Sequence, residues 1–157
     1  FLTVINNGIL SLPTDFSRAK CDQIVDLYVI VNAVENLPSG SYFYSMEKKQ
    51  LELLKSGDFR DEAGHLGFEQ ALPADAAAVF FFMGNVEHII NRCGTRGYRI
   101  AEMESGIFGG NLYLGMHSLG FGSTGLTFYD DDVTKFFSPH AQNQSPLFVV
   151  PVGIKHK

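Results

Sequence analysis

The pattern in this sequence most suggestive of ligand chemistry is the glycine-rich turn Gly120–Gly125. It reads Gly-Phe-Gly-Ser-Thr-Gly and matches the GxGxxG spacing of a dinucleotide-binding loop. That loop needs a strand before it and a helix after it, so that the phosphates meet a helix N-terminus. Here a helix is expected before the turn and an extended segment after it. We therefore reject a dinucleotide-binding unit. The turn is either a backbone-lined approach for an anionic ligand or a helix C-cap with glycine past its end, and the two are compatible.

Metal and nucleophile motifs are missing from the sequence. Asp130–Asp132 lacks the further alternating oxygen ligands of a calcium loop, and its acidic residues suit the start of a helix. Neither a GxSxG elbow nor a Gly-Lys-Ser/Thr phosphate loop occurs. No two histidines lie three to five residues apart, so there is no HxxxH motif and we assign no metal site. The five histidines are His65, His88, His117, His140 and His156.

The two cysteines and three nearby arginines form a further candidate group. Cys21 and Cys93 are too few for a disulfide-rich scaffold or a four-cysteine zinc site. Cys93 lies among Arg92, Arg96 and Arg99, and neighbouring cations raise the reactivity of a thiol. The alternative for Cys93 is an ordinary packing residue. The arginines suit a phosphate or a partner's carboxylate, or they belong to a solvated helix start.

Composition and charge narrow the function classes. The chain has 157 residues, 45% of them apolar and 18% charged, which is typical of one globular domain. Twelve basic against seventeen acidic residues give a net charge of −5, whereas nucleic-acid binders usually carry a basic excess. No apolar run reaches the roughly 18 residues that a membrane helix needs. We therefore expect neither nucleic-acid nor membrane partners, and a cytoplasmic location.

The start of the chain is unusual. It opens on Phe1 inside an apolar stretch and lacks the charged region, apolar region and cleavage site of a signal peptide. We expect residues 1–157 to be a single domain that is incomplete at its N-terminus and belongs to a longer or tandem polypeptide.

Apolar runs and turn residues predict the order of the elements. Nearly continuous β-branched and aromatic sequence predicts buried strands, and alternation after the turn at 36–40 predicts a hairpin. Pro151 indicates that the last strand lies at an edge or carries a bulge. The mixture favours an α+β fold over regular βαβ alternation. The predicted strands are 24–31, 41–46, 50–54, 76–83 and 146–153, the predicted helices are 59–70, 86–92, 98–119 and 133–137, and 120–125 is a loop before an extended stretch at 126–129.

The helix predicted over 98–119 contains four glycines. Each costs about 1 kcal/mol relative to alanine in a helix interior, so close approach by another helix or a ligand is the expected reason for them. The alternative is two shorter helices broken near Gly109-Gly110. The residues expected on one apolar face of this helix are Ile100, Met103, Ile107, Leu114 and Met116.

Three ordered stretches resemble the FMN-dependent nitroreductase superfamily, in particular its SagB-type or thiazoline-oxidase-like branch. Leu27–Tyr42 is similar to the branch's strand and "V-E-G-L-P-x-G-x-Y" turn. Arg96–Leu114 is similar to its "R-G-Y-R…E-x-G…N-L-Y-L" central helix, with Glu104 and Gly106 at the matching positions. Leu119–Gly122 followed by Asp130–Asp132 looks like "L-G-L-G…D-D-D". The resemblance covers about residues 24–153.

The resemblance implies a fold, a cofactor and a site. It implies an α+β sandwich whose mostly antiparallel sheet is flanked by helices, with the glycine-rich helix at the interface of a homodimer or of two tandem repeats. FMN would bind between the protomers and exchange hydride with NAD(P)H or an organic substrate. No catalytic residue is assigned. The cofactor-binding residues implied by position are Gly120, Gly122, Thr127 and Phe128 near the flavin, and Lys155 and Lys157 near its phosphate, although basic residues that close a chain are more often solvated.

Several family features are missing, and they motivate an alternative function. Nothing matches the N-terminal "R-R-S-x-R" segment, and the "P-S-A-G" flavin loop falls on Ser17–Lys20, without the proline or glycine. The Lys-Tyr pair of thiazoline oxidases falls on Arg92-Cys93, and arginine does not act as a base near neutrality. The C-terminal "V-G-R-P" becomes Val152–Lys155. The alternative is a degenerate, non-catalytic repeat that serves as a dimerisation scaffold for an active partner.

Overall fold

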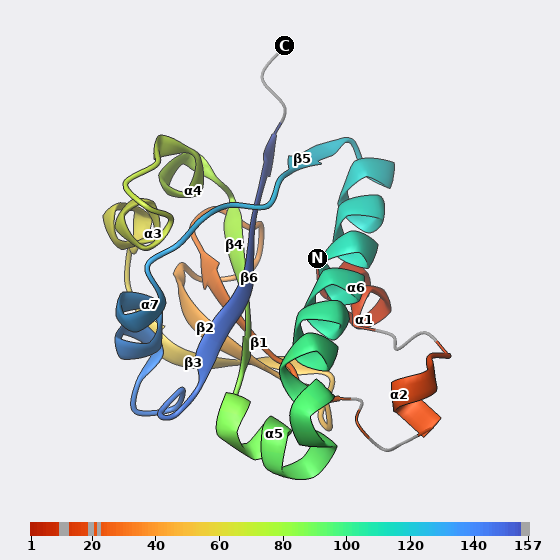
Figure 1. Cartoon of the computed structure of the whole chain (residues 1–157). Coiled ribbons are helices and arrows are strands. Elements are labelled where there is room, and N and C mark those ends of the chain that lie inside the picture. Colours follow the sequence, from red (N-terminus) through yellow and green to blue (C-terminus); the bar gives the residue numbers. More distant parts are fainter. Residues whose placement is uncertain (10–12, 19–20, 22, 155–157) are drawn as a thin grey trace.

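The computed structural model is a three-layer sandwich with one six-stranded sheet in the middle (Figure 1). It describes residues 1–9, 13–18, 21 and 23–154. The sheet order is β3-β2-β1-β4-β6-β5, and all neighbouring strands are antiparallel. The strands are β1 (Asp26–Val31), β2 (Gly40–Ser45), β3 (Gln50–Ser56), β4 (Ala78–Gly84), β5 (Phe121–Ser123) and β6 (Ser145–Ile154).

Helices cover both faces of the sheet. In Figure 1, α1, α5 and α6 lie on one side, and α3, α4 and α7 lie on the other. The α+β sandwich with an antiparallel sheet flanked by helices is therefore confirmed. The helices are α1 (Leu2–Gly8), α2 (Asp15–Arg18), α3 (Arg60–Leu66), α4 (Ala71–Asp75), α5 (Val86–Cys93), α6 (Gly97–Ser118) and α7 (Asp130–Phe137), with a 3-10 turn at Gly94–Arg96.

The central strands are buried on both faces, which explains their unbroken apolar sequence. Side chains alternate along a strand. In β4, Phe80 and Phe82 pack in the core beneath α6, while Phe81 and Met83 pack in the core beneath α7. All four are at most 1% exposed. The predicted central strand, hairpin and second buried strand are confirmed as β1, β2–β3 and β4, and the short helix at 86–92 as α5.

Local conformation corrects the predictions between β3 and β4. The helix predicted over 59–70 ends at Leu66, because Phe68 (φ 64°) and Glu69 (φ 57°) adopt the left-handed region, which ends a helix. The short helix α4 then includes Pro73, in a stretch between 70 and 76 for which sequence analysis predicted no element. Proline is tolerated there because the first turn of a helix has no amide partners to lose.

Pro151 lies in an interior strand, so the edge alternative is wrong, whereas the alternative of a bulge agrees with a register shift in the β4–β6 pair. Ala77 N donates to Val152 O (2.9 Å) on the β4 side, whereas Leu126 N donates to Val149 O (3.1 Å) on the opposite side. Backbone groups alternate along a strand. Pro151 therefore faces the gap between the end of β5 and Leu126, where no amide donor is needed. The irregularity in the β4–β6 register lies near the start of β6, away from Pro151.

The central helix α6 runs unbroken for 22 residues, so the alternative of two shorter helices is wrong. Two of its glycines permit close packing. A Cβ on Gly109 would lie 2.4 Å from the Phe148 ring, and one on Gly115 would lie 2.7 Å from Val4. Gly106 and Gly110 have open space where a Cβ would point.

The predicted apolar face of α6 divides between two sides of the helix. Ile100 and Met116 are buried, at 5% and 3% exposure. Met103 and Leu114, in contrast, are 52% and 72% exposed. The expectation of one apolar face is therefore wrong, because α6 has a packed side and an exposed side that both carry apolar residues.

A buried carboxylate joins α6 to the start of β1. Glu104 is 2% exposed. Its Oε1 accepts a hydrogen bond from Gln23 N (2.7 Å), and its Oε2 accepts from Ile24 N (2.8 Å) and Val25 N (3.0 Å). Backbone amides bound to a carboxylate make charge-assisted hydrogen bonds, which are stronger than neutral ones. Glu104 therefore fixes how the helix lies against the sheet.

Replacement of Glu104 by glutamine is expected to destabilise the protein by about 1–3 kcal/mol, because an amide oxygen cannot replace a bidentate carboxylate and its NH₂ meets further donors. Urea unfolding followed by far-UV circular dichroism measures this change. Glu102→Gln, on the same helix and only half-buried, is the control and should change stability by less than about 0.5 kcal/mol. Equal stability of the two variants would contradict this role of Glu104.

Candidate functional site

Gly120 ends α6 and turns the chain into the edge strand β5. It has φ +84°, and its N–H donates to His117 O at 3.0 Å. This is the left-handed glycine C-cap that sequence analysis proposed as one explanation of the glycine-rich turn. The following residues form β5, so the loop predicted over 120–125 is in part a strand.

A groove of about 350 Å³ lies beside β5 and the end of β6. Gly122 and Gly153 are opposite each other across the β5–β6 pair, so two neighbouring positions in this groove carry no side chain. Ligand atoms can therefore approach the backbone closely there. The groove is lined by Leu72, Asp75, Ala76, Gly122, Ser123, Thr124, Pro151, Val152, Gly153 and Ile154.

The free edge of β5 supplies hydrogen-bonding groups beside this groove. β5 is the last strand of the sheet and pairs only with β6 among the described residues. An edge strand leaves alternate N–H and C=O groups without a strand partner. Such a row of donors and acceptors, next to apolar walls such as Leu72 and Ile154, suits a flat ligand with a polar rim.

The structure places the predicted site residues in different surroundings. Gly122 lines the groove, whereas Thr127 and Phe128 are not among its lining residues. Thr127 is exposed, and Phe128 packs on the core beneath α7. Both belong to the segment that crosses from β5 to α7 (Figure 1). Lys155 and Lys157 lie outside the described residues.

Three polar residues of the groove were not among the predicted site residues. Ser123 and Thr124 lie inside the GxGxxG turn, so the turn itself was a signal for them. Asp75 comes from α4, about fifty residues earlier, and no motif connects it to the turn. Asp75 is the one ionisable side chain among the lining residues. A phosphate would therefore need cationic groups from outside this set.

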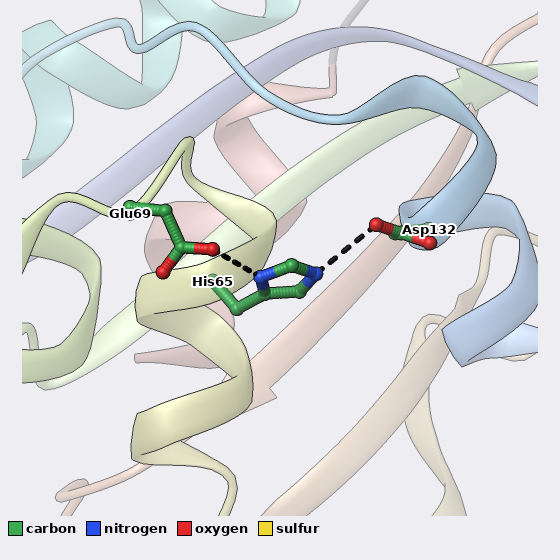
Figure 2. Close-up of polar contacts among 3 residues, drawn as sticks. All are labelled: His65, Glu69 and Asp132. Carbon is green, nitrogen blue, oxygen red and sulfur yellow. Dashed lines mark hydrogen bonds and ion pairs between the residues drawn. The ribbon is translucent and has the colours of Figure 1, made fainter.

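A second polar group, separate from the groove, joins α3 to α7. Figure 2 shows the His65 ring between two carboxylates: Nδ1 lies 2.5 Å from Glu69 Oε1 and Nε2 lies 3.0 Å from Asp132 Oδ2. The hydrogen bonds to Glu69 and Asp132 raise the pKa of His65. Asp130–Asp132 form the first turn of α7, as predicted. In the part of the chain that the structure describes, no group of three or more His, Cys, Asp or Glu side chains is arranged to hold a metal.

The raised pKa of His65 predicts a pH-dependent stability. Because the pKa in the folded state lies above the unfolded value of about 6.5, the stabilisation is complete below that pH. It is lost as the pH rises through the folded-state pKa. The free energy of unfolding of the wild type, measured with a chemical denaturant, should therefore fall between about pH 6 and pH 8.5. In His65→Gln the free energy of unfolding should depend less steeply on pH over this range.

His88→Gln is the matched control for this measurement. His88 is exposed on α5 and makes no side-chain ion pair in the described structure. Its replacement should leave the wild-type slope in place. A slope in His65→Gln as steep as that of the wild type would contradict the role of His65.

The structure joins Cys21 to Cys93 in a disulfide, with a Cα–Cα distance of 5.8 Å. Neither explanation that sequence analysis offered for Cys93, a reactive free thiol or an ordinary packing residue, describes this bond. Arg96, one of the nearby arginines, pairs with Asp15 of α2 at 3.1 Å. The basic group therefore contacts a carboxylate of the same chain.

Comparison with known sequences gives the family. The nitroreductase family matches residues 13–154, and the chain belongs to that family. A curated relative from Methanocaldococcus jannaschii, provisionally named a nitroreductase, is 29% identical over 132 residues. The match covers 83% of this chain and 65% of the relative. The chain thus spans just under two thirds of that relative's length.

Solved structures share the fold. A provisionally named nitroreductase from Anabaena variabilis has a TM-score of 0.86 and 25% identity, over 99% of this chain and 32% of its own. The E. coli microcin synthetase McbBCD complex with truncated pro-MccB17 bound has a TM-score of 0.78 and 17% identity, over 98% and 62%. The NADPH:FMN oxidoreductase of Vibrio harveyi, complexed with NAD+, has a TM-score of 0.63 and 19% identity, over 99% and 58%. Within the described ranges, no helix is long and apolar enough to cross a membrane.

Proposed function

We propose that this chain is part of an FMN-dependent oxidoreductase that transfers hydride between NAD(P)H or an organic substrate and the flavin. The observation that carries the proposal is the family match over residues 13–154, which includes α6, β5 and the groove beside them. The names of two structural neighbours support the cofactor. One is the NADPH:FMN oxidoreductase of V. harveyi, and the other is an FMN-dependent nitroreductase of Clostridium difficile.

The groove residues fit a flavin in chemical type. FMN, when bound, supplies the hydride-accepting centre, and the protein supplies binding, orientation and electrostatics. Gly122 and Gly153 leave the backbone open to a flat ring, and the free edge of β5 offers hydrogen-bonding groups to its polar rim. Leu72 and Ile154 provide apolar walls for the ring.

Other parts of the proposed site follow from the resemblance to the family. We assign Thr127 to the surroundings of the flavin ring, and its exposure supports this assignment. Phe128 would bring an aromatic face to the same region. The groove has no cationic lining residue, so we assign the phosphate to Lys155 and Lys157, which follow Ile154 in the sequence. The SagB-type branch remains part of this proposal, supported by the fold shared with the microcin synthetase complex.

We propose that the exposed side of α6 binds a second copy of this fold. Met103 and Leu114 are large apolar side chains that remain more than half exposed there. Gly106 and Gly110 are on open parts of the same helix and would let another backbone approach closely. A contiguous apolar surface of this kind marks an interaction site in soluble proteins.

Gly122→Val is expected to weaken FMN binding at least about tenfold, because its side chain would occupy the space beside the β5 backbone. Gly122 has no left-handed φ, so valine suits the strand and the fold should persist. Binding is measured by titrating the purified protein, with its natural flanking sequence, with FMN and following flavin fluorescence. Ser56→Val on β3, at the opposite edge of the sheet, is the control and should bind as wild type.

The same titration tests the function. A wild-type protein that holds FMN and is reduced by NAD(P)H supports the oxidoreductase. A protein that forms the dimer but neither holds FMN nor is reduced would contradict it, and would support the alternative of a dimerisation scaffold.

Leu114→Glu is expected to shift the protein from dimer to monomer, because the charge would be desolvated in the proposed interface. Sedimentation velocity at several protein concentrations measures the shift. Leu53→Glu is the control, since Leu53 is similarly exposed (53%) but lies on β3 at the far edge of the sheet. Loss of the dimer in both variants, or in neither, would contradict the α6 interface.

A further inference from the structure

We propose that the Cys21–Cys93 disulfide is a redox-operated clamp that docks the α2 segment (the described residues 13–18 and 21) onto the corner between α5 and α6. This proposal concerns a conformational device and does not depend on flavin binding. The bond joins residues 72 positions apart in the sequence. Cys21 lies just after α2, and Cys93 is the last residue of α5.

Besides the disulfide, a small apolar cluster and an exposed ion pair join the α2 segment to this corner. Phe16 and Cys21 are buried with Ile100 in a small cluster that is separate from the two main cores of the sheet. Asp15 pairs with Arg96 at 3.1 Å, but these side chains are 70% and 67% exposed. Exposed ion pairs contribute little to stability. The disulfide therefore holds the docked segment more firmly than this ion pair does.

The contacts of Glu104 limit how far the effect of the disulfide reaches. Its carboxylate holds the amides of Gln23, Ile24 and Val25 without any help from the cysteines. Gln23 also has a left-handed backbone (φ 54°), which marks a change of chain direction between the segment and β1. Opening the disulfide should thus release the α2 segment and leave the sheet in place.

Of the two bonded cysteines, Cys93 is the more exposed residue. Cys93 is half-buried, whereas Cys21 is only 5% exposed. The neighbouring Arg92 and Arg96 are exposed cations that favour the approach of a thiolate. We therefore assign the attack of a reducing thiolate to Cys93 Sγ, with Cys21 leaving as the thiolate.

A dithiol can reduce the Cys21–Cys93 bond by thiol–disulfide exchange. Its first thiolate forms a mixed disulfide with Cys93 and breaks the Cys21–Cys93 bond. Its second thiolate then attacks that mixed disulfide and releases Cys93. The reductant loses two electrons and two protons as it becomes a disulfide, and the protein gains them as two thiols. Such an exchange opens the clamp in reducing surroundings and closes it in oxidising ones.

Hydrogen exchange followed by mass spectrometry, with and without dithiothreitol, tests this clamp in the full chain. The reporter is the peptide over residues 13–21, in which Cys21 N donates to Phe16 O at 3.0 Å. Reduction should speed its exchange about tenfold, while a peptide over β4 stays unchanged. The double variant Cys21→Ser/Cys93→Ser should exchange at the fast rate with or without dithiothreitol.

Asp15→Ala is the control that removes the ion pair but keeps the disulfide. It should keep the slow exchange until dithiothreitol is added. Three results would overturn the proposal. They are equal exchange of residues 13–21 in the two redox states, loss of protection in β4 together with the segment, and two alkylatable thiols in the protein oxidised under air.

Discussion

The position of the central helix depends on one buried carboxylate. Glu104 binds three consecutive amides at the start of β1, and β1 is the strand to which both β2 and β4 pair. Because a buried carboxylate needs such partners, the helix and the middle of the sheet have one favourable relative position. The far end of α6 then determines where Gly120 turns the chain, and so where β5 meets β6. The β5 side of the groove is thus placed by a contact that lies more than fifteen residues before Gly122 in the sequence.

Much of the fold could be predicted because the sheet is buried on both sides. Apolar runs in β1 and β4 have no exposed face, so a simple hydropathy pattern was sufficient to identify them. The hairpin and the unbroken α6 also followed from local sequence. The boundaries around α3 and α4 did not, since they depend on left-handed residues such as Phe68 that have no strong sequence signal.

The two sides of α6 show why periodicity alone could not assign its contacts. Met103 and Leu114 are apolar in the same way as Ile100 and Met116, but no element of the described chain covers them. A sequence pattern records which residues avoid water and does not record whether their partner belongs to the same chain. The prediction of an edge strand from Pro151 was wrong for a related reason. A proline requires only that its own backbone nitrogen has no hydrogen-bonding partner, and the rest of the strand can be paired on both sides.

The candidate site was predictable in part. The spacing of the glycines pointed to Gly122, which lines the groove, and the helix predicted before the turn agrees with Gly120 as the C-cap of α6. Asp75 comes from a helix that local sequence did not predict, so its place in the groove depended on tertiary structure. The bond between Cys21 and Cys93 could not be predicted for the same reason. The two cysteines are 72 positions apart in the sequence, and their pairing depends on how α2 docks.

The ring of Phe148 has a consequence for how this sequence can diverge. It occupies the space beside Gly109 of α6, and it also lies 2.8 Å from where a Cβ of Gly125 would stand. One aromatic side chain therefore fills two positions that have no side chain of their own. A larger residue at either glycine would be tolerated only after the ring became smaller. Across homologues these three sites should therefore covary in volume, linking the helix to the crossing segment over long evolutionary separations.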